Sequence, residues 1–286
     1  MTGDGGPGAV GTVAVLGLGL IGGSLARDLA ARGVRVVAYD RDAAALRSAR
    51  EAGIVRGQMD AGLGGVVGAD VVIVATPVDE AHGVLRQIAG LNLGARLVMD
   101  VGSTKSSVVA TATAVGLGPL FVGSHPLTGD HTSGWSASRE RLFDGARVFV
   151  CPSGEATTGP VALAMMFWSS LGAIPECIDA REHDERLAWS SHLPHVVSSA
   201  LSLALSGAGI RRSELGPGGR DVTRLAGSSP DVWTPILREN APTIAAGLAA
   251  VEDELRTMRR LLLATDSAEL DGHLTKARAW FGASEG

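Results

Sequence analysis

The chain has 286 residues, 45% of them hydrophobic and 19% charged, which is typical of a folded globular protein with a substantial core. Its formal net charge is −5 and it contains no block of lysine and arginine, so we expect no nucleic-acid partner. The only cysteines, Cys151 and Cys177, match no metal or redox spacing, which argues against a disulfide framework and indicates a reducing, cytoplasmic location.

The first residues of the chain are rich in glycine and lack the basic region and apolar core of a signal peptide. We therefore predict a flexible tail over residues 1–11. No apolar run approaches the roughly 18 residues that a membrane-spanning helix needs, so we expect no membrane partner.

Short valine-rich runs then alternate with segments of helical spacing. The runs predicted as strands are Thr12–Leu16, Val34–Tyr39, Val71–Ala75, Arg96–Val101, Leu120–Gly123 and Ala146–Cys151. Ser24–Arg32 and Ala43–Ala52 are typical of the intervening helices. This alternation indicates βαβ units in a mostly parallel sheet, and strands that are apolar on both sides indicate helices on both faces. We predict a Rossmann-type dinucleotide-binding domain over residues 12–179.

The pattern changes after about Asp179, where strand-like runs end. Helical spacing occurs at Glu182–Ser206, Thr243–Leu263 and Ser267–Trp280, whereas Gly207–Pro230 is typical of loops or short elements. The long segments are rich in alanine and leucine, and such faces must be buried against another surface. We therefore predict an α/β protein in which an all-helical domain, residues 180–286, follows the dinucleotide-binding domain.

The first strand is followed by Gly17-Leu18-Gly19-Leu20-Ile21-Gly22, which fits G-x-G-x-x-G between a strand and a helix. In this motif Gly17 permits the tight turn, Gly19 lets the backbone approach a pyrophosphate, and Gly22 lets the helix pack on the strand. The alternative is a glycine-rich turn that binds no dinucleotide. The flanking strand and helix favour the cofactor.

An acid follows the second strand. Asp40 lies eighteen positions after Gly22, where a carboxylate can bind both ribose hydroxyls and repel a 2′-phosphate. This favours NAD over NADP. The alternative is that Asp40 turns away and the adjacent Arg41 holds a 2′-phosphate.

Three further segments place polar residues where strands of the predicted sheet end. Ala75-Thr76-Pro77 follows one strand, at the edge where open α/β sheets bind ligands. Ser103 follows the next, where its hydroxyl either meets a ligand or caps a helix. His125 follows the strand after that, and its near-neutral pKa suits acid–base catalysis. A lone histidine is more often structural, but this position favours catalysis.

At this point the sequence resembles the prephenate/arogenate dehydrogenases of tyrosine biosynthesis, over nearly the whole chain. The shared motifs are the glycine loop through Ser24, Ala75–Val78, Asp100–Lys105, Gly123–Pro126, Ser133-Gly134, Leu142-Phe143, His183-Asp184, Ser191–His195, Thr223–Ala226, Ser229-Pro230 and Trp233. The serine–lysine, His-Pro and Ser-His-Leu-Pro-His segments, in this order, are highly specific.

The resemblance implies oxidation of a cyclohexadienol: hydride leaves for NAD, the ring loses carbon dioxide, and the product is aromatic. The substrate itself is the electron sink, so no metal is expected. By resemblance His125 takes the hydroxyl proton, and Ser103 lies near both the hydroxyl and the nicotinamide. Arg224 matches an arginine that grips a substrate carboxylate with its two-pronged guanidinium. The alternative for Arg224 is a surface or interdomain ion pair.

Four further residues belong to the same prediction. His192 and His195 lie three apart on a predicted helix, so they share a face, and one of them, with His195 preferred, should line the substrate pocket. Trp233 forms a pocket wall or packs in the core. Lys105 either tunes the local charge or is an exposed helix lysine.

The resemblance also implies an intertwined homodimer formed by the helical domain, and the length leaves no room for a fused regulatory domain or mutase.

The loop after the His-Pro segment departs from the family. Many relatives continue Ala-Gly-Thr-Glu or Thr-Gly-Thr-Ala, whereas this chain has Thr128-Gly129-Asp130-His131. A carboxylate at Asp130 would pair with the ammonium group of arogenate and repel the keto acid prephenate, unless both residues face solvent. We therefore favour arogenate as substrate. The alternatives are a 4-amino-4-deoxyprephenate-type dehydrogenase, a β-hydroxyacid dehydrogenase and an NAD-sensing protein without turnover.

Overall fold

The computed structural model describes residues 10–129 and 132–283. Most of the tail predicted over residues 1–11, and the residues Asp130 and His131, therefore lie outside the described part of the chain. Within those ranges, no helix is both long and apolar enough to cross a bilayer.

The dinucleotide-binding part is built on a five-stranded parallel sheet of strand order β3-β2-β1-β4-β5. Its strands are β1 (Thr12–Leu16), β2 (Arg35–Tyr39), β3 (Gly57–Gln58), β4 (Val71–Val74) and β5 (Leu97–Asp100). Its helices are α1 (Leu20–Ala31), α2 (Ala43–Glu51), α3 (Val78–Ala89), α4 (Ser106–Ala114) and α5 (Thr158–Ser170). This strand order is that of a mononucleotide-binding βαβαβ fold.

Alternate residues of β1 face opposite helical layers. Val13 and Val15 pack into a core with residues of α1, α2 and α5. Ala14 and Leu16 point the other way, into a second core with residues of α3 and α4. A strand has a side-chain period of two, so a strand buried on both faces must be apolar throughout. The predicted coverage of both faces is confirmed.

A second, three-stranded sheet corrects the prediction of one mostly parallel sheet. It contains β6 (Val122–Pro126), β7 (Arg147–Pro152) and β8 (Ile174–Cys177), with β6 and β7 antiparallel and β7 and β8 parallel. The predicted strand Leu120–Gly123 begins too early, because Gly118–Leu120 forms a 3₁₀ turn that contains Pro119. Strand β8 escaped the sequence analysis because it is largely exposed and has no apolar run. His125 consequently lies within a strand, not after one.

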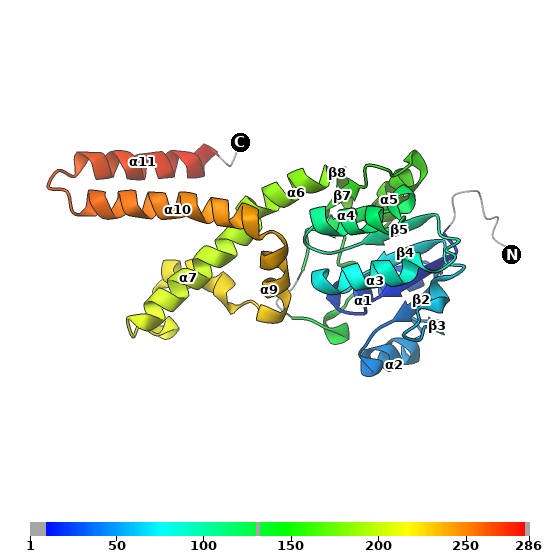
Figure 1. Cartoon of the computed structure of the whole chain (residues 1–286). Helices are drawn as coiled ribbons and strands as arrows, with labels where there is room; N and C mark the ends of the chain where they lie inside the picture. The colour runs from blue at the N-terminus through cyan, green and yellow to red at the C-terminus, as the bar shows by residue number, and fades with distance from the viewer. Residues whose placement is uncertain (1–9, 130–131, 284–286) are drawn as a thin grey trace.

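The rest of the described chain is helical. Helix α6 (Ala180–Leu187), a π-helical turn (Ala188–His192) and α7 (Leu193–Gly207) follow one another without a break, where one helix was predicted. Then come α8 (Pro217–Val222), a 3₁₀ turn (Arg224–Gly227), α9 (Pro230–Glu239), α10 (Ala241–Leu262) and α11 (Ala268–Ala283). Helices α10 and α11 form an antiparallel pair that extends away from the sheets (Figure 1). The predicted fold class, a dinucleotide-binding α/β domain followed by a helical one, is confirmed.

Candidate active site

The glycine loop has the backbone that the sequence motif requires. Gly17 has φ +103°, and a Cβ there would lie 2.5 Å from the Ala75 carbonyl oxygen. A Cβ on Gly22 would lie 2.0 Å from the Gly17 carbonyl oxygen, so a side chain there would push α1 off the loop. A Cβ on Gly19 would meet no heavy atom within 4 Å, so the loop presents bare backbone on that side.

Two observations fit a dinucleotide at this loop. Helix α1 begins without a side-chain cap or an acidic residue in its first turn, which leaves its N–H groups available to an anion. The buried Thr76 hydroxyl, next to the loop, has no hydrogen-bond partner within the described residues. A pyrophosphate would satisfy the N–H groups, and polar atoms of a nucleotide would satisfy the hydroxyl.

The acid after β2 is held against the glycine loop. Asp40 Oδ2 accepts a hydrogen bond from the Leu18 N–H at 2.5 Å, and Oδ1 accepts one from the Asp42 N–H at 2.7 Å. The neighbouring Arg41 forms an exposed ion pair with Glu80 on α3. At the position where a ribose would bind, the Asp40 carboxylate therefore faces the glycine loop. The neighbouring Arg41 is already paired with the Glu80 carboxylate.

A cavity of about 380 Å³ lies where the two parts of the chain meet. It is lined by Ser103, His125, Pro126, Leu127, Thr128, Leu187, Ser190, Ser191, His192, Val232, Trp233 and Ile236. These residues come from the loop after β5, from β6 and the two residues that follow it, from the end of α6 and the π-helical turn after it, and from α9. The structure thus brings Ser103, His125, His192 and Trp233 together from four separate segments.

The other predicted substrate residues lie elsewhere. His195 stacks on the Trp233 ring at a centroid distance of 3.3 Å and does not line the cavity; His192, the less favoured of the two histidines, does. His192 also meets the Trp233 ring edge-on, so the two histidines share a side as predicted. Arg224 lines a separate cavity of about 450 Å³ with Arg212, and its carboxylate-binding role stays a prediction.

Ser103 does not cap a helix. Helix α4 begins at Ser106, and its first N–H groups are bound from the helical part of the chain. Asp184 Oδ1 accepts from the Lys105 N–H and Oδ2 from the Ser106 N–H, both at 2.8 Å. The Ser103 side chain is thereby left to the cavity.

Lys105 is neither exposed nor on the helix surface, which corrects that alternative. Its side chain is completely buried, and Nζ forms an ion pair with Asp100 and donates to the Ser124 carbonyl oxygen at 2.9 Å. Its stem passes close to Gly123, where a Cβ would lie 3.1 Å from Lys105 Cδ. The lysine is buried because the second sheet packs over the start of α4, which sequence spacing does not reveal.

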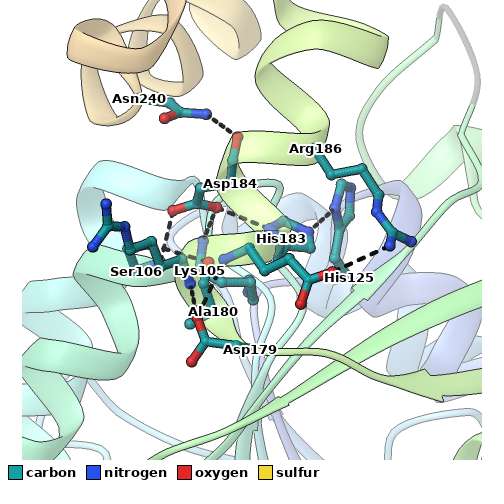
Figure 2. A network of polar contacts seen from close by, with 12 residues as sticks. Lys105, Ser106, His125, Asp179, Ala180, His183, Asp184, Arg186 and Asn240 are labelled. Atoms are coloured by element: carbon teal, nitrogen blue, oxygen red, sulfur yellow. Dashed lines mark hydrogen bonds and ion pairs between the residues drawn. The ribbon is translucent and has the colours of Figure 1, made fainter.

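His183 and Asp184 are part of the site, although no role was predicted for them. His183 Nε2 lies 2.9 Å from His125 Nδ1, and His183 Nδ1 lies 2.8 Å from Asp184 Oδ1 (Figure 2). Burial opposes ionisation of Asp184, but hydrogen bonds from His183, Ser106 and Lys105 outweigh it and lower the pKa to about 2. The available sequence signal was an adjacent histidine and aspartate at the start of a helix.

His125 is suited to accept a proton. Burial, followed by the neighbouring His183, lowers the pKa of His125 well below its ordinary value, so its ring is neutral near pH 7. A neutral imidazole on a cavity wall has one nitrogen with a free lone pair. The cavity therefore combines a neutral imidazole, the Ser103 hydroxyl and an aromatic wall.

His192 makes the stability of the protein depend on pH. Its Nδ1 accepts a hydrogen bond from Asn240 Nδ2 at 3.3 Å, and burial lowers its pKa to about 4. Between about pH 6.5 and 4 the unfolded chain binds a proton that the folded chain does not, so stability falls as the pH drops. Below about pH 4 both states are protonated and this contribution no longer changes.

We expect this histidine alone to remove about 3 kcal/mol of unfolding free energy between pH 7 and 4. Urea unfolding across this range should give a flatter profile for His192→Leu than for the wild type. A matched control is Leu261→Ala, which truncates a buried side chain that does not titrate and should lower stability equally at every pH. Equal slopes for wild type and His192→Leu would contradict the assignment.

Sequence comparison matches two family profiles to this chain: "Prephenate dehydrogenase, nucleotide-binding domain" over residues 25–175 and "Prephenate dehydrogenase, dimerization domain" over residues 179–276. The chain is 31% identical to a cyclohexadienyl dehydrogenase of Zymomonas mobilis over 93% of both chains. It is 33% identical to a prephenate dehydrogenase of Bacillus subtilis over 82% of this chain, and it spans 65% of that relative.

Solved structures agree with these matches. A prephenate dehydrogenase from A. aeolicus in complex with hydroxyphenyl propionate and NAD+ superposes with a TM-score of 0.87 at 26% identity, covering 96% of this chain and 98% of that one. An arogenate dehydrogenase from Synechocystis gives a TM-score of 0.82 at 26% identity, covering 96% and 99%. Both similarities extend through the helical domain.

Proposed function

This chain belongs to the prephenate dehydrogenase family, and we propose that it oxidises and decarboxylates a cyclohexadienol such as arogenate or prephenate. The carbinol hydrogen would leave as hydride for a bound nicotinamide, the hydroxyl proton passes to His125, and the electrons of the ring–carboxylate bond enter the ring as carbon dioxide departs. The proton then returns from His125 to the phenolate oxygen, so the products are carbon dioxide, reduced cofactor and tyrosine or 4-hydroxyphenylpyruvate. The observation that carries this proposal is the cavity in which Ser103 and His125 lie together.

The residues around the cavity have distinct roles in this proposal. His125 accepts the hydroxyl proton, and Ser103 donates a hydrogen bond that orients the hydroxyl. Trp233 and His192 wall the ring, which limits the orientations in which the carbinol hydrogen can approach the cofactor. Arg224 is proposed as a carboxylate ligand and His195 as a residue of the substrate pocket from the sequence alone, since neither lines this cavity.

We propose NAD as the cofactor, held by Gly17–Gly22 and the Ala75–Pro77 segment; when bound, it supplies the hydride acceptor. Asp40, fixed against the loop, supports NAD because a carboxylate there repels a 2′-phosphate. The ion pair of Arg41 with Glu80 also supports it, since the arginine that would have to hold that phosphate is already engaged.

We propose that the helical domain pairs two copies of this chain. Its long helices expose apolar side chains that a single chain leaves uncovered, and α11 buries none of its residues. The most exposed leucines are Leu203 (74%), Leu255 (63%), Leu262 (66%) and Leu263 (82%). The match of this region to a dimerization domain supports the same assembly.

A kinetic assay tests the proposed function and its substrate. The protein is mixed with NAD or NADP and with either arogenate or prephenate, and the formation of reduced cofactor and carbon dioxide is followed. We expect equimolar products, faster turnover with NAD, and a larger kcat/KM for arogenate because of Asp130. The variant Asp130→Asn should reduce the preference for arogenate.

Three outcomes would contradict parts of this proposal. Absence of turnover with both substrates, while NAD binds, would make the protein a cofactor-binding protein without this activity. A larger kcat/KM for prephenate would remove the role given to Asp130. Turnover of only a 4-amino-4-deoxy analogue or of a β-hydroxyacid would replace the substrate class.

A further inference from the structure

We propose that His183 and Asp184 are positioning residues that hold His125 in the tautomer with the proton on Nδ1. In this tautomer Nε2, on the opposite side of the ring, carries the lone pair that accepts the substrate proton. The inference rests on the proposed function, because it concerns how His125 acts as the base. It gives a role to His183 and Asp184, which do not line the cavity.

The direction of the hydrogen bonds begins at Asp184. Its two oxygens accept the N–H groups of Lys105 and Ser106 at the start of α4, where the helix dipole also favours a negative charge. Its pKa of about 2 keeps it ionised near neutral pH. An ionised carboxylate can only accept, so the proton in the 2.8 Å contact with His183 belongs to His183 Nδ1.

The second step follows from the charge of His183. Its ring is fully buried, and burial lowers its pKa, so it is neutral and carries a single N–H. Because that N–H is directed to Asp184, His183 Nε2 must accept. In the 2.9 Å contact between these rings, His125 Nδ1 is therefore the donor and bears the proton.

The third step concerns rigidity and charge. The ring of His183 packs edge-on against Phe149 at 5.4 Å, and the Asp184 carbonyl oxygen accepts from Asn240 Nδ2 at 2.7 Å. The chain of contacts thus crosses from α6 of the helical domain to β6 (Figure 2). When His125 gains the substrate proton, its new charge is stabilised through His183 by the carboxylate of Asp184.

The other titratable and charged groups near these histidines are either paired or neutral. They are Lys105 with its partner Asp100, the neutral His192 on the cavity wall, and Arg147 and Arg186 beside the Phe149 ring, both paired with Glu176. Asp184 is therefore the carboxylate that is linked to His125 by hydrogen bonds, with His183 as the single intervening residue.

The test uses His183→Leu and His183→Gln. We expect His183→Leu to lower kcat by about 10²-fold, the lower end of what a general base contributes, with little change in KM. The acid limb of the kcat profile should move, because the protonated base loses its hydrogen-bonded link to Asp184. Nitrogen-15 NMR of the ring should show the proton of His125 moving from Nδ1 to Nε2. His183→Gln retains an acceptor for His125 Nδ1 and should restore part of kcat and the original tautomer.

The matched control is His82→Leu, which removes a half-buried histidine that bonds Thr111 Oγ1 at 2.8 Å and lies 3.3 Å from Glu239 but does not line the cavity. It should leave the His125 signals and kcat unchanged.

His125→Asn, measured in parallel, separates the two proposals. Full activity of His125→Asn would overturn the proposed function. Loss of activity in His125→Asn with a wild-type kcat, pH profile and tautomer in His183→Leu would overturn the positioning role alone. A proton on His125 Nε2 in the wild-type protein would also overturn it, without any variant.

Discussion

Replacing His125 by asparagine is expected to lower kcat by about 10²- to 10⁴-fold, the range contributed by a positioned general base. Asparagine still donates and accepts hydrogen bonds on the cavity wall, but it cannot take the hydroxyl proton near neutral pH. His125 is followed in β6 by a buried proline and is paired with Phe149 of β7, so the strand should hold the shorter side chain in place.

The measurement is steady-state kinetics together with NAD titration of the same variant. We expect the dissociation constant for NAD to stay at its wild-type value, because the substitution does not change the glycine loop or Asp40. Weaker NAD binding would show a disturbed fold instead of a lost base. A wild-type kcat would exclude His125 as the proton acceptor.

Replacing Lys105 by methionine is expected to lower the unfolding free energy by about 3–5 kcal/mol. Methionine fills a similar volume, but it leaves Asp100, itself buried, without its charged partner. Removing one member of a buried ion pair destabilises the protein by more than the intact pair stabilises it. The remaining charge stays buried without water and without a partner. Chemical denaturation monitored by circular dichroism measures the difference.

The chain offers a matched control for this substitution. Lys276→Met makes the same chemical change on an exposed face of α11 and should alter stability by no more than about 0.5 kcal/mol. Combining Lys105→Met with Asp100→Asn should recover part of the loss, since no charge is then left buried. Equal effects of the two lysine substitutions would contradict the importance of the buried pair.

The sequence by itself determined the fold class and the family. Apolar runs at Thr12–Leu16 and Val71–Ala75 predict doubly covered strands, because strand periodicity is local and needs no partner to be recognised. Gly17, Gly19 and Gly22 predict the loop for the same reason, since each glycine meets a backbone requirement set within a few residues. The loss of strand-like runs after Asp179 likewise predicts the helical part that follows.

Only the tertiary structure decided how the site is completed. His125 and His183 are 58 residues apart, and Lys105 and Asp184 are 79 apart, so their contacts depend on how the second sheet and α6 pack on the first domain. The same packing buries Lys105, places His192 on the cavity wall and leaves His195 stacked on Trp233. Burial and hydrogen-bond direction, which set the charge and tautomer of each group, are properties of neighbours distant in the chain, and residue spacing carries no record of them.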